Sequence, residues 1–473
     1  MIQVNDERAR KFELAQELPH QEGVMHKIKR ALILILAICA AVWLIADPWA
    51  FKEAAGLFEV RRPAIQLSGF LAIALMSVAM LLALRPRSVE PHLGGLDKMY
   101  RLHKWLGISA LVVGIVHFLW AKGPKWAVGW GLLERPTRGP RPPIDNPVEQ
   151  FLAGMRGAAE GLGEWAFYAA VLLIALALIK RFPYWIFCKT HRLLAIAYLV
   201  LVFHSVVLLK FSYWTSPIGI VLIPLLAGGV YAAVVVLLRR VGSDRQIEGK
   251  IASLQYYPGV RALETRIDVP DGWPGHKPGQ FAFATSDPSE GPHPYTIASE
   301  WTAGSRHITF ITKELGDHTR RLRDKLRVGQ SVKLEGPYGC FTFEDDLKRQ
   351  IWIGGGVGIT PFIAKMKHRA ASAANSPANP EVDLFHASAE YDEVAFEKLK
   401  ADAAAANVRL HILLDARDGL LSGERIRAEV PQWREASIWF CGPPGFGDAL
   451  RQDFAAHGFN VAAQFHQELF AMR

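Results

Sequence analysis

The sequence predicts a multi-domain protein in which an all-α bundle of six transmembrane helices precedes an antiparallel β-barrel and a doubly wound α/β domain. Three observations predict this architecture. Six long apolar stretches occupy the first half of the chain, short alternating runs bounded by turns come next, and strand-like runs alternate with helical ones at the end. We expect a cytoplasmic tail at 1–30, then domains at 31–240, 246–346 and 347–473.

Four of the apolar stretches have about the 20 residues that a helix needs to cross a bilayer, and the two shorter ones, 31–46 and 165–179, could instead be buried soluble helices. The predicted spans are 31–46, 65–84, 103–121, 165–179, 191–209 and 217–238. Lys and Arg cluster before the first span, after the second and sixth, and between the fourth and fifth, which predicts that both termini are cytoplasmic in an inner or plasma membrane. Residues 122–164 would then form a long external loop.

The charge and the cysteines narrow the choice of partners. The net charge of +9 is accounted for by the basic flanks of the spans, so we expect contact with membrane lipid and none with nucleic acid. The four cysteines are far apart and lack iron–sulfur spacing, so a plant-type ferredoxin domain is not expected.

Two pairs of histidines lie inside or at the edge of predicted spans. His103 and His117 are 14 residues apart, and His191 and His204 are 13 apart, so each pair covers about 20 Å of helix axis. Neutral imidazoles that face each other across two helices are typical ligands of haem iron, so the four residues are candidate metal ligands for two stacked haems. The alternative is packed, hydrogen-bonded histidines. A 13-residue spacing leaves His191 and His204 on different faces of an ideal helix, so either a helix distortion or oblique ligation must make up the difference.

The barrel region contains two candidate sites. Runs such as Phe281–Ala284, His307–Thr312 and Ser331–Leu334 are predicted strands. In the segment His293-Pro-Tyr-Thr, the ring of Tyr295 can cover a flavin and Thr296 can hydrogen-bond its N5 edge. The segment Gly316-Asp-His-Thr-Arg-Arg opens a predicted helix and is a candidate anion site, although each segment could also be an ordinary strand or helix cap.

The last region alternates strands with helices. Its predicted strands are Gln350–Ile353, Val382–His386, Leu410–Leu414 and Ser437–Cys441. The glycine-rich turn in Ile351–Phe362 lets backbone N–H groups approach a pyrophosphate, and Phe440-Cys-Gly-Pro-Pro-Gly follows another strand, so two loops at one sheet edge could hold one dinucleotide. Cys441 would lie beside a nicotinamide or serve as a small buried hydrophobe.

The order of these motifs, with Gly-Pro-Tyr-Gly at 336–339 between them, resembles the ferredoxin–NADP reductase superfamily. Six spans with paired histidines ahead of it resemble the ferric reductase and NADPH oxidase family. The resemblance implies FAD, two haem b groups and NADPH or NADH as cofactors. It pairs His103 with His191 for the inner haem and His117 with His204 for the outer one.

The resemblance also assigns roles to single residues. The flavin contacts it implies are His293, Pro294, Tyr295, Thr296, Lys313, Gly316, Asp317, Thr319 and Gly336. The nicotinamide contacts it implies are Gly355, Gly356, Gly358, Thr360, Pro361, Cys441, Gly442 and Pro443. Thr296 and Cys441 are its candidate catalytic residues, together with Phe470 as the aromatic ring against the flavin, although three residues follow Phe470 in this chain.

The activity implied is transmembrane electron transfer from cytoplasmic NAD(P)H through FAD and the haems to an acceptor on the outer face. That acceptor would be O2, giving superoxide, or a ferric or cupric chelate. Arg61 matches an arginine that helps oxygen-reducing relatives receive O2 and is a candidate catalytic residue, but Ala121 stands where those relatives have a histidine. Arg61 could instead be an interfacial anchor.

Two other functions fit the same residues: a cytochrome b subunit that feeds a quinone or a periplasmic partner protein, and a reductase anchored by a haem-free bundle. The choice between NADPH and NADH also stays open. Ser388 could accept the ribose of either nucleotide, and Arg417 is a candidate for the 2′-phosphate.

Overall fold

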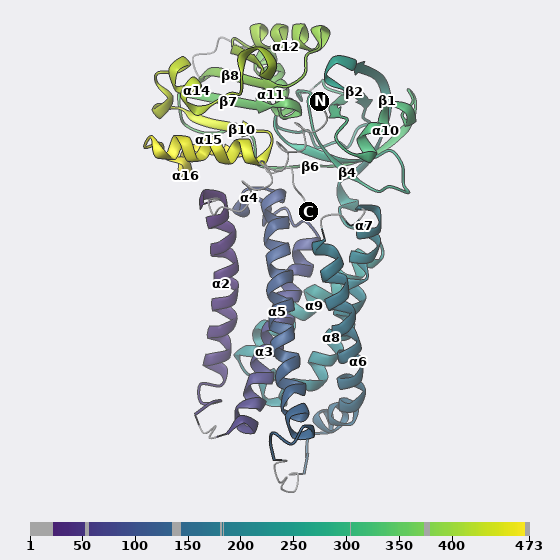
Figure 1. Ribbon diagram of the computed structural model, residues 1–473. Helices are drawn as coiled ribbons and strands as arrows, with labels where there is room; N and C mark the ends of the chain where they lie inside the picture. The colour runs from purple at the N-terminus through teal and green to yellow at the C-terminus, as the bar shows by residue number, and fades with distance from the viewer. Residues whose placement is uncertain are drawn as a thin grey trace. The chain divides into compact units, whose positions relative to one another are not determined.

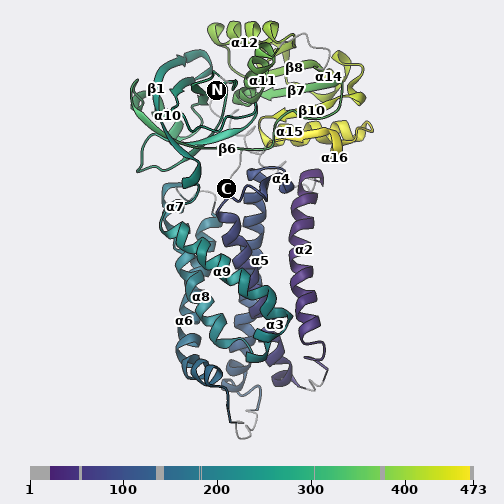
Figure 2. The same ribbon diagram turned by 180° about the vertical axis from the view of Figure 1, so that it is seen from behind.

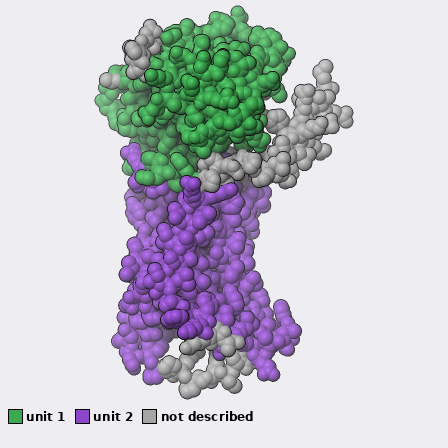
Figure 3. Space-filling view, turned by 90° about the vertical axis from the view of Figure 1, so that its left-hand side faces the viewer, with its two compact units in different colours: residues 1–27, 90–98, 242–472 green, residues 28–89, 99–241, 473 purple. Residues whose placement is uncertain are grey.

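The computed structural model describes residues 22–52, 56–134, 143–179, 182, 184–302, 304–372 and 379–468. They form two compact units (Figure 3). Among the described residues, the helical unit contains 28–89 and 99–241, and the sheet unit contains 22–27, 90–98 and 242–468. Most of the predicted N-terminal tail lies outside the described residues.

The helical unit contains the predicted spans. Six helical segments are long and apolar enough to cross a membrane: Lys27–Ala46, Leu57–Ala83, Leu96–Gly129, Pro147–Leu178, Ile186–Leu208 and Pro217–Leu237. The helices are α2 (Glu22–Ala46), α3 (Leu57–Ala83), α5 (Leu96–Gly129), α6 (Pro147–Leu178), α7 (Tyr184–Arg192), α8 (Leu194–Leu208) and α9 (Pro217–Leu237). Within this unit, α6 packs along α8 and α3 along α9 (Figures 1 and 2).

The predicted long loop at 122–164 is wrong in its described part. Helix α5 continues to Gly129, and α6 begins at Pro147. The side chain of Asn146 caps α6 by accepting hydrogen bonds from the N–H groups of Val148 and Glu149, and a proline at the first helical position suits a helix start. Both helices therefore extend beyond their apolar segments, which hydropathy alone could not reveal.

The interior of the helical unit is held by close packing. Tyr198 is fully buried, and its hydroxyl lies 2.8 Å from the Ser77 hydroxyl on α3. A Cβ added at Gly229 would lie 1.9 Å from the Tyr198 oxygen, so only glycine lets α9 approach this ring. Apolar side chains such as Ile45 and Ile220 are instead 70% and 74% exposed, as expected for a surface that faces lipid.

In the sheet unit, the first part is a six-stranded antiparallel sheet with the order β4-β3-β6-β1-β2-β5. A bridge between Ile297 and Phe310 connects the chain after β4 to β5, which closes the sheet into the predicted barrel. The elements are β1 (Gln246–Tyr257), β2 (Ala262–Asp268), β3 (Phe281–Thr285), β4 (His293–Thr296), β5 (His307–Lys313), α10 (Asp317–Lys325) and β6 (Ser331–Tyr338), after the short helix α4 (Glu90–Leu93).

The second part is a five-stranded parallel sheet with the order β11-β10-β7-β8-β9. Its strands are β7 (Arg349–Gly355), β8 (Glu381–Ser388), β9 (Arg409–Leu414), β10 (Ser437–Cys441) and β11 (Phe465–Gln467). Its helices are α11 (Thr360–Ala371), α12 (Glu393–Ala405), α13 (Asp415–Asp418), α14 (Gly423–Glu429), α15 (Pro444–Ala456) and α16 (Val461–Gln464).

Both faces of this sheet are buried. Ile351 and Ile353 belong to one hydrophobic core, while Trp352, between them, belongs to another. This is the pattern of a doubly wound sheet with helices on both sides, as predicted. Strand order reverses at β7, which has β8 on one side and β10 on the other, and ligands of such sheets bind at the carboxyl ends of the strands beside this switch point.

Candidate functional site

The four predicted histidines face each other in two pairs within the helical unit. The ring centroids of His103 on α5 and His191 on α7 are 6.0 Å apart, and those of His117 on α5 and His204 on α8 are 6.2 Å apart. The ring planes of the two pairs meet at 67° and 83°. The structure thus brings together the pairs that the sequence suggested.

These separations suit one metal ion between each pair. With a metal–nitrogen bond of about 2 Å on each side, two imidazoles that share a metal place their ring centroids about 6 Å apart. An edge-to-face contact of two histidines would have the same separation, so the hydrogen bonds of the rings provide the second test.

Three of the four rings use Nδ1 for a backbone carbonyl on another helix. His103 Nδ1 lies 2.9 Å from Ala79 O, His117 Nδ1 lies 3.1 Å from Ile65 O, and His204 Nδ1 lies 2.8 Å from Ala159 O. A proton on Nδ1 donates this bond and leaves Nε2 with its lone pair, which is the tautomer that binds a metal. The donor set therefore fits bis-histidine haem.

Glycines make room for two of the rings. A Cβ added at Gly163 on α6 would lie 2.0 Å from His204 Nδ1, and one added at Gly69 on α3 would lie 3.1 Å from His117 Cε1. Any side chain at Gly163 would push the imidazole away from its carbonyl partner.

A helix interruption accompanies the 13-residue spacing of the second pair. The chain that carries His191 and His204 is not one continuous helix, because α7 ends at Arg192 and α8 begins at Leu194. Both rings still meet their partners on α5. The distortion that the spacing requires is thus present, and it lies next to His191.

Arg61 is bound to the backbone of α5. Its Nε donates to Trp120 O at 3.0 Å and its Nη2 donates to Ala121 O at 2.8 Å. Pro124 lies inside α5 and has no N–H group, so the carbonyl of Trp120 lacks its usual partner four residues on. Arg61 donates to that carbonyl, so its position is explained by a structural hydrogen bond and no electron acceptor is needed to explain it. A role of Arg61 toward O2 stays a prediction.

The barrel places the predicted flavin residues on β4 and at the start of α10. Tyr295 is half-buried against Phe310, with ring centroids 5.7 Å apart, and Thr296 is buried. The Thr319 hydroxyl accepts hydrogen bonds from the N–H groups of Leu315 and Gly316 at 3.0 and 3.1 Å, which fixes the turn into α10. An aromatic ring, a hydroxyl and a helix N-terminus fit the ring and pyrophosphate of FAD.

Burial keeps two of these groups neutral. It lowers the pKa of His293 to about 4, with a further contribution from His318, and it raises the pKa of Tyr295, with a further contribution from the charge of Glu290. At neutral pH, Tyr295 is therefore a phenol.

The two predicted nucleotide loops meet at one sheet edge. Cys441 pairs with Gly354 across β10 and β7, and a Cβ added at Gly358 would lie 2.1 Å from Cys441 O. A Cβ at Gly355 would lie 2.9 Å from Pro443 Cδ. Cys441 is fully buried, and burial raises its pKa well above the usual value, so its thiol stays protonated.

The remaining predicted nucleotide residues lie near this edge. Thr360 donates to Val357 O at 2.8 Å inside the turn. Lys313 is paired with Glu390 at 2.7 Å, and Arg261 binds the same carboxylate. A pocket between the two sheets of this unit is lined by Lys313, Gly356 and Ser388 among others. Arg417 is paired with its neighbour Asp418.

Several candidate residues were not predicted. Glu468 is buried beyond β11, and its pKa is raised to about 8, first by burial and then by Asp97. Glu290 and His318 surround the predicted flavin residues, and Glu390 lies at the end of β8. His318 lies within the predicted anion-site segment but was not assigned a role, and the three glutamates have no local pattern, so only the fold reveals their contacts. Phe470 lies outside the described residues.

Comparison with known proteins covers both halves. Residues 68–202 match the family model "Ferric reductase like transmembrane component". The 2-halobenzoate 1,2-dioxygenase electron transfer component of Burkholderia cepacia is 26% identical over 204 residues, which is 41% of this chain and 58% of that protein. The flavohemoprotein of Pseudomonas putida is 28% identical over 197 residues, 40% of this chain and 50% of that protein. The chain thus spans little more than half the length of these relatives.

Two of the solved structures that are similar to this chain illustrate the extent of the likeness. The FAD/NAD binding domain of nitric oxide dioxygenase from Vibrio cholerae has 21% identity and a TM-score of 0.41, and covers 47% of this chain and 98% of that one. The cytochrome P450 reductase GcoB of Amycolatopsis has 21% identity and a TM-score of 0.41, and covers 48% and 70%. At these TM-scores neither likeness bears on activity.

The transmembrane match includes His103, His117 and His191 and ends two residues before His204, and the two curated relatives are an electron transfer component and a flavohemoprotein. The chain thus combines similarity to a ferric reductase-like transmembrane component with similarity to an electron transfer component and a flavohemoprotein.

Proposed function

We propose that the protein carries electrons from cytoplasmic NAD(P)H, through FAD and two bis-histidine haems, to an acceptor on the outer face of the membrane. The observation that carries this proposal is that four histidines face each other in two pairs. The ring centroids are 6.0 and 6.2 Å apart, and Nδ1 of three of the rings is hydrogen-bonded to a backbone carbonyl. Two carriers stacked along α5 suit a path across the bilayer.

When bound, FAD would take a hydride from NAD(P)H and pass on single electrons, which the haems can accept one at a time. The chain's residues hold and orient these groups. His103 and His191 would hold the inner haem, and His117 and His204 the outer haem. Tyr295 would lie against the flavin ring, Thr296 would bond its edge, and the turn before α10 would hold its pyrophosphate.

The sheet edge formed by β7 and β10 would bind the nicotinamide nucleotide. Gly356 has open space beside it that the pyrophosphate would occupy, while Gly355 and Gly358 let the loop with Gly442 and Pro443 approach to line the other side. The buried Cys441 would lie beside the nicotinamide as a neutral thiol. Glu390 at the end of β8 could accept from a ribose 2′-hydroxyl, which would favour NADH, whereas release of Lys313 from Glu390 would favour NADPH.

A ferric or cupric chelate is the acceptor we propose, with O2 as the alternative. Ala121 offers no side-chain donor to O2 near the outer histidine pair, and Arg61 already binds two carbonyls of α5. Arg62, one residue on, is exposed and could attract an anionic chelate.

Reconstitution in sealed vesicles tests the proposal. Ferric citrate is enclosed inside, NADPH is added outside, and ferrous iron is measured inside with a trapped chelator. We expect NADPH-dependent iron reduction inside, and its loss in the His204→Ala variant. No iron reduction inside the vesicles, or reduction that persists at the wild-type rate in His204→Ala, would contradict transfer through the haems.

A further inference from the structure

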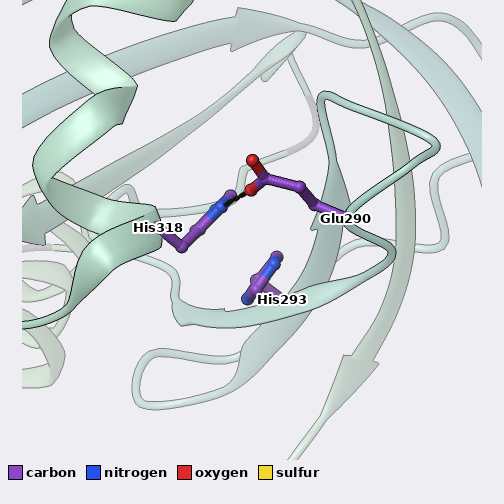
Figure 4. A group of neighbouring side chains, drawn as sticks. All are labelled: Glu290, His293 and His318. Atoms are coloured by element: carbon purple, nitrogen blue, oxygen red, sulfur yellow. Dashed lines mark hydrogen bonds and ion pairs between the residues drawn. The ribbon is translucent and has the colours of Figure 1, made fainter. Parts of the chain in front are cut away.

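Glu290, His293 and His318 form a cluster beside the predicted flavin residues (Figure 4). His293 begins β4, His318 is on the first turn of α10, and Glu290 lies in the turn before β4. The two imidazole rings stack with centroids 3.6 Å apart and planes within 9°. One ligand atom from each residue lies within 4.8 Å of the others, so two functions compete: a metal site and a hydrogen-bonded brace.

The hydrogen bonds favour the brace. His318 Nε2 lies 2.9 Å from the Tyr295 hydroxyl, and His318 Nδ1 forms a short contact with Glu290 Oε2. Both ring nitrogens of His318 are therefore in use. Glu290 is also paired with Lys325, whose ammonium would repel a metal cation.

One direction of hydrogen bonding satisfies all three groups. Burial raises the pKa of Tyr295, so the phenol keeps a proton that it can donate to His318 Nε2. With Nε2 as the acceptor, Nδ1 carries the imidazole proton and donates it to Glu290. The pairing with Lys325 lowers the pKa of Glu290, which keeps the carboxylate charged as the terminal acceptor. Tyr295, His318 and Glu290 therefore form one chain of hydrogen bonds that runs from the hydroxyl through the imidazole to the carboxylate.

We propose that His318, held by Glu290, is a positioning residue that fixes the Tyr295 ring in the orientation that stacks on the flavin. The inference rests on the proposed function, because that function assigns Tyr295 to the flavin. A phenol that is hydrogen-bonded to an anchored imidazole cannot rotate freely, so the ring would be ordered before FAD binds. The entropy lost on ordering the ring would then not reduce the affinity for FAD.

Flavin fluorescence provides the test, because a stacked tyrosine quenches flavin emission whereas a merely structural contact elsewhere does not. In the purified full-length protein, without a polyhistidine tag, we expect His318→Ala to weaken FAD binding by about five- to tenfold, the scale of one lost hydrogen bond. We also expect brighter emission from the bound flavin and a shift of its reduction potential. His307→Ala is the matched control, since His307 lies on β5 of the same barrel outside the cluster.

Two further variants separate the brace from a folding defect. His318→Gln keeps an acceptor for the phenol and a donor for Glu290, so it should restore most of the affinity and the quenching. Tyr295→Phe keeps the ring but removes the hydroxyl, so adding His318→Ala to it should cost little more, whereas independent roles would give additive losses.

The outcomes are distinct. Wild-type affinity and quenching in His318→Ala, or additive losses in the double variant, would overturn the brace while the proposed function stands. Zinc bound stoichiometrically at micromolar concentration, and lost in His318→Ala, would overturn it in favour of a metal site. If the wild-type protein bound no FAD, the proposed function itself would fail.

Discussion

At His204, the imidazole ring is oriented by the backbone rather than by another side chain. Its Nδ1 lies 2.8 Å from the carbonyl of Ala159 on α6, and Gly163, four residues further along that helix, leaves the space that the ring occupies. A carbonyl partner fixes both the tautomer and the direction of the imidazole, which a metal ligand requires.

Substituting Gly163 with alanine tests this arrangement. The added Cβ would lie 2.0 Å from His204 Nδ1, so the ring must move and its bond to Ala159 must break. We expect haem content to fall from about two groups per chain toward about one, with FAD content unchanged. Haem is measured by the pyridine haemochrome method.

Gly161→Ala is the control, because a Cβ at Gly161 meets nothing within 4 Å on the same helix. Equal haem content in both variants would show that His204 does not depend on the space beside Gly163.

Part of the candidate site could be predicted from the residue types and their spacing in the sequence. The histidine pairs and the motifs around Tyr295 and Cys441 were visible because each has a local pattern. Glu290 and His318 were not, because their role depends on the fold of the turn before β4 against α10. The carbonyl partners of the histidines could not be predicted either, since they come from positions such as Ala79 and Ile65 with no side-chain signature.

Among the elements, β7 and β10 have a strict geometric requirement at the predicted nucleotide loops. Their carboxyl ends approach so closely that a Cβ at Gly358 would lie 2.1 Å from the backbone oxygen of Cys441. A backbone atom cannot give way as a flexible side chain can, so the two nucleotide loops would have to separate.

Gly358→Ala should therefore weaken nucleotide binding more than it affects the other cofactors. We expect KM for NADPH and NADH to rise about tenfold or more, the equivalent of roughly 1.4 kcal/mol. Steady-state reduction of ferricyanide measures this directly. Gly304→Ala, where a Cβ meets open space in the barrel, should behave like the wild type. An unchanged KM in Gly358→Ala would place the nucleotide elsewhere.

Periodicity predicted the elements better than their ends. All the spans and the seven predicted strands are present, since apolar runs and alternation report directly on burial. The extension of α6 to Pro147 was not predicted, because a polar helix end leaves no apolar pattern. The spacing of His191 and His204 indicated a possible helix distortion but not its place between α7 and α8.

At the scale of the whole molecule, buried histidines of the sheet unit make stability depend on pH. Burial lowers the pKa of His276 and of His386 to about 4. His276 Nδ1 accepts from Trp273 Nε1 at 3.3 Å, and its Nε2 lies 3.0 Å from Ser299 O, so the neutral ring satisfies both contacts and the charged ring cannot.

The direction of this pH dependence follows from the difference in proton binding between the folded and unfolded chains. The unfolded chain binds protons to these histidines near pH 6.5 while the folded chain resists until about pH 4, so stability falls as pH decreases through this window. At pH 5 each of these two histidines lowers the free energy of unfolding by about 2 kcal/mol relative to pH 7.

Thermal unfolding of the full-length protein in detergent measures the effect. His276→Gln keeps an acceptor and a donor for the same partners without titrating, so its Tm should fall less than that of the wild type between pH 7 and pH 5. His457→Gln, at an exposed position, should follow the wild type. Parallel curves for all three proteins would rule out His276 as a source of the pH dependence.

The central claim is that one chain passes electrons from NAD(P)H to two haems, and anaerobic reduction tests it most directly. NADPH or NADH is mixed with the purified, haem- and FAD-loaded protein without oxygen, and the haem absorbance is followed with time. We expect flavin bleaching first and then reduction of both haems, with the second phase diminished in Gly163→Ala. Flavin that is reduced while both haems stay oxidised would contradict the account.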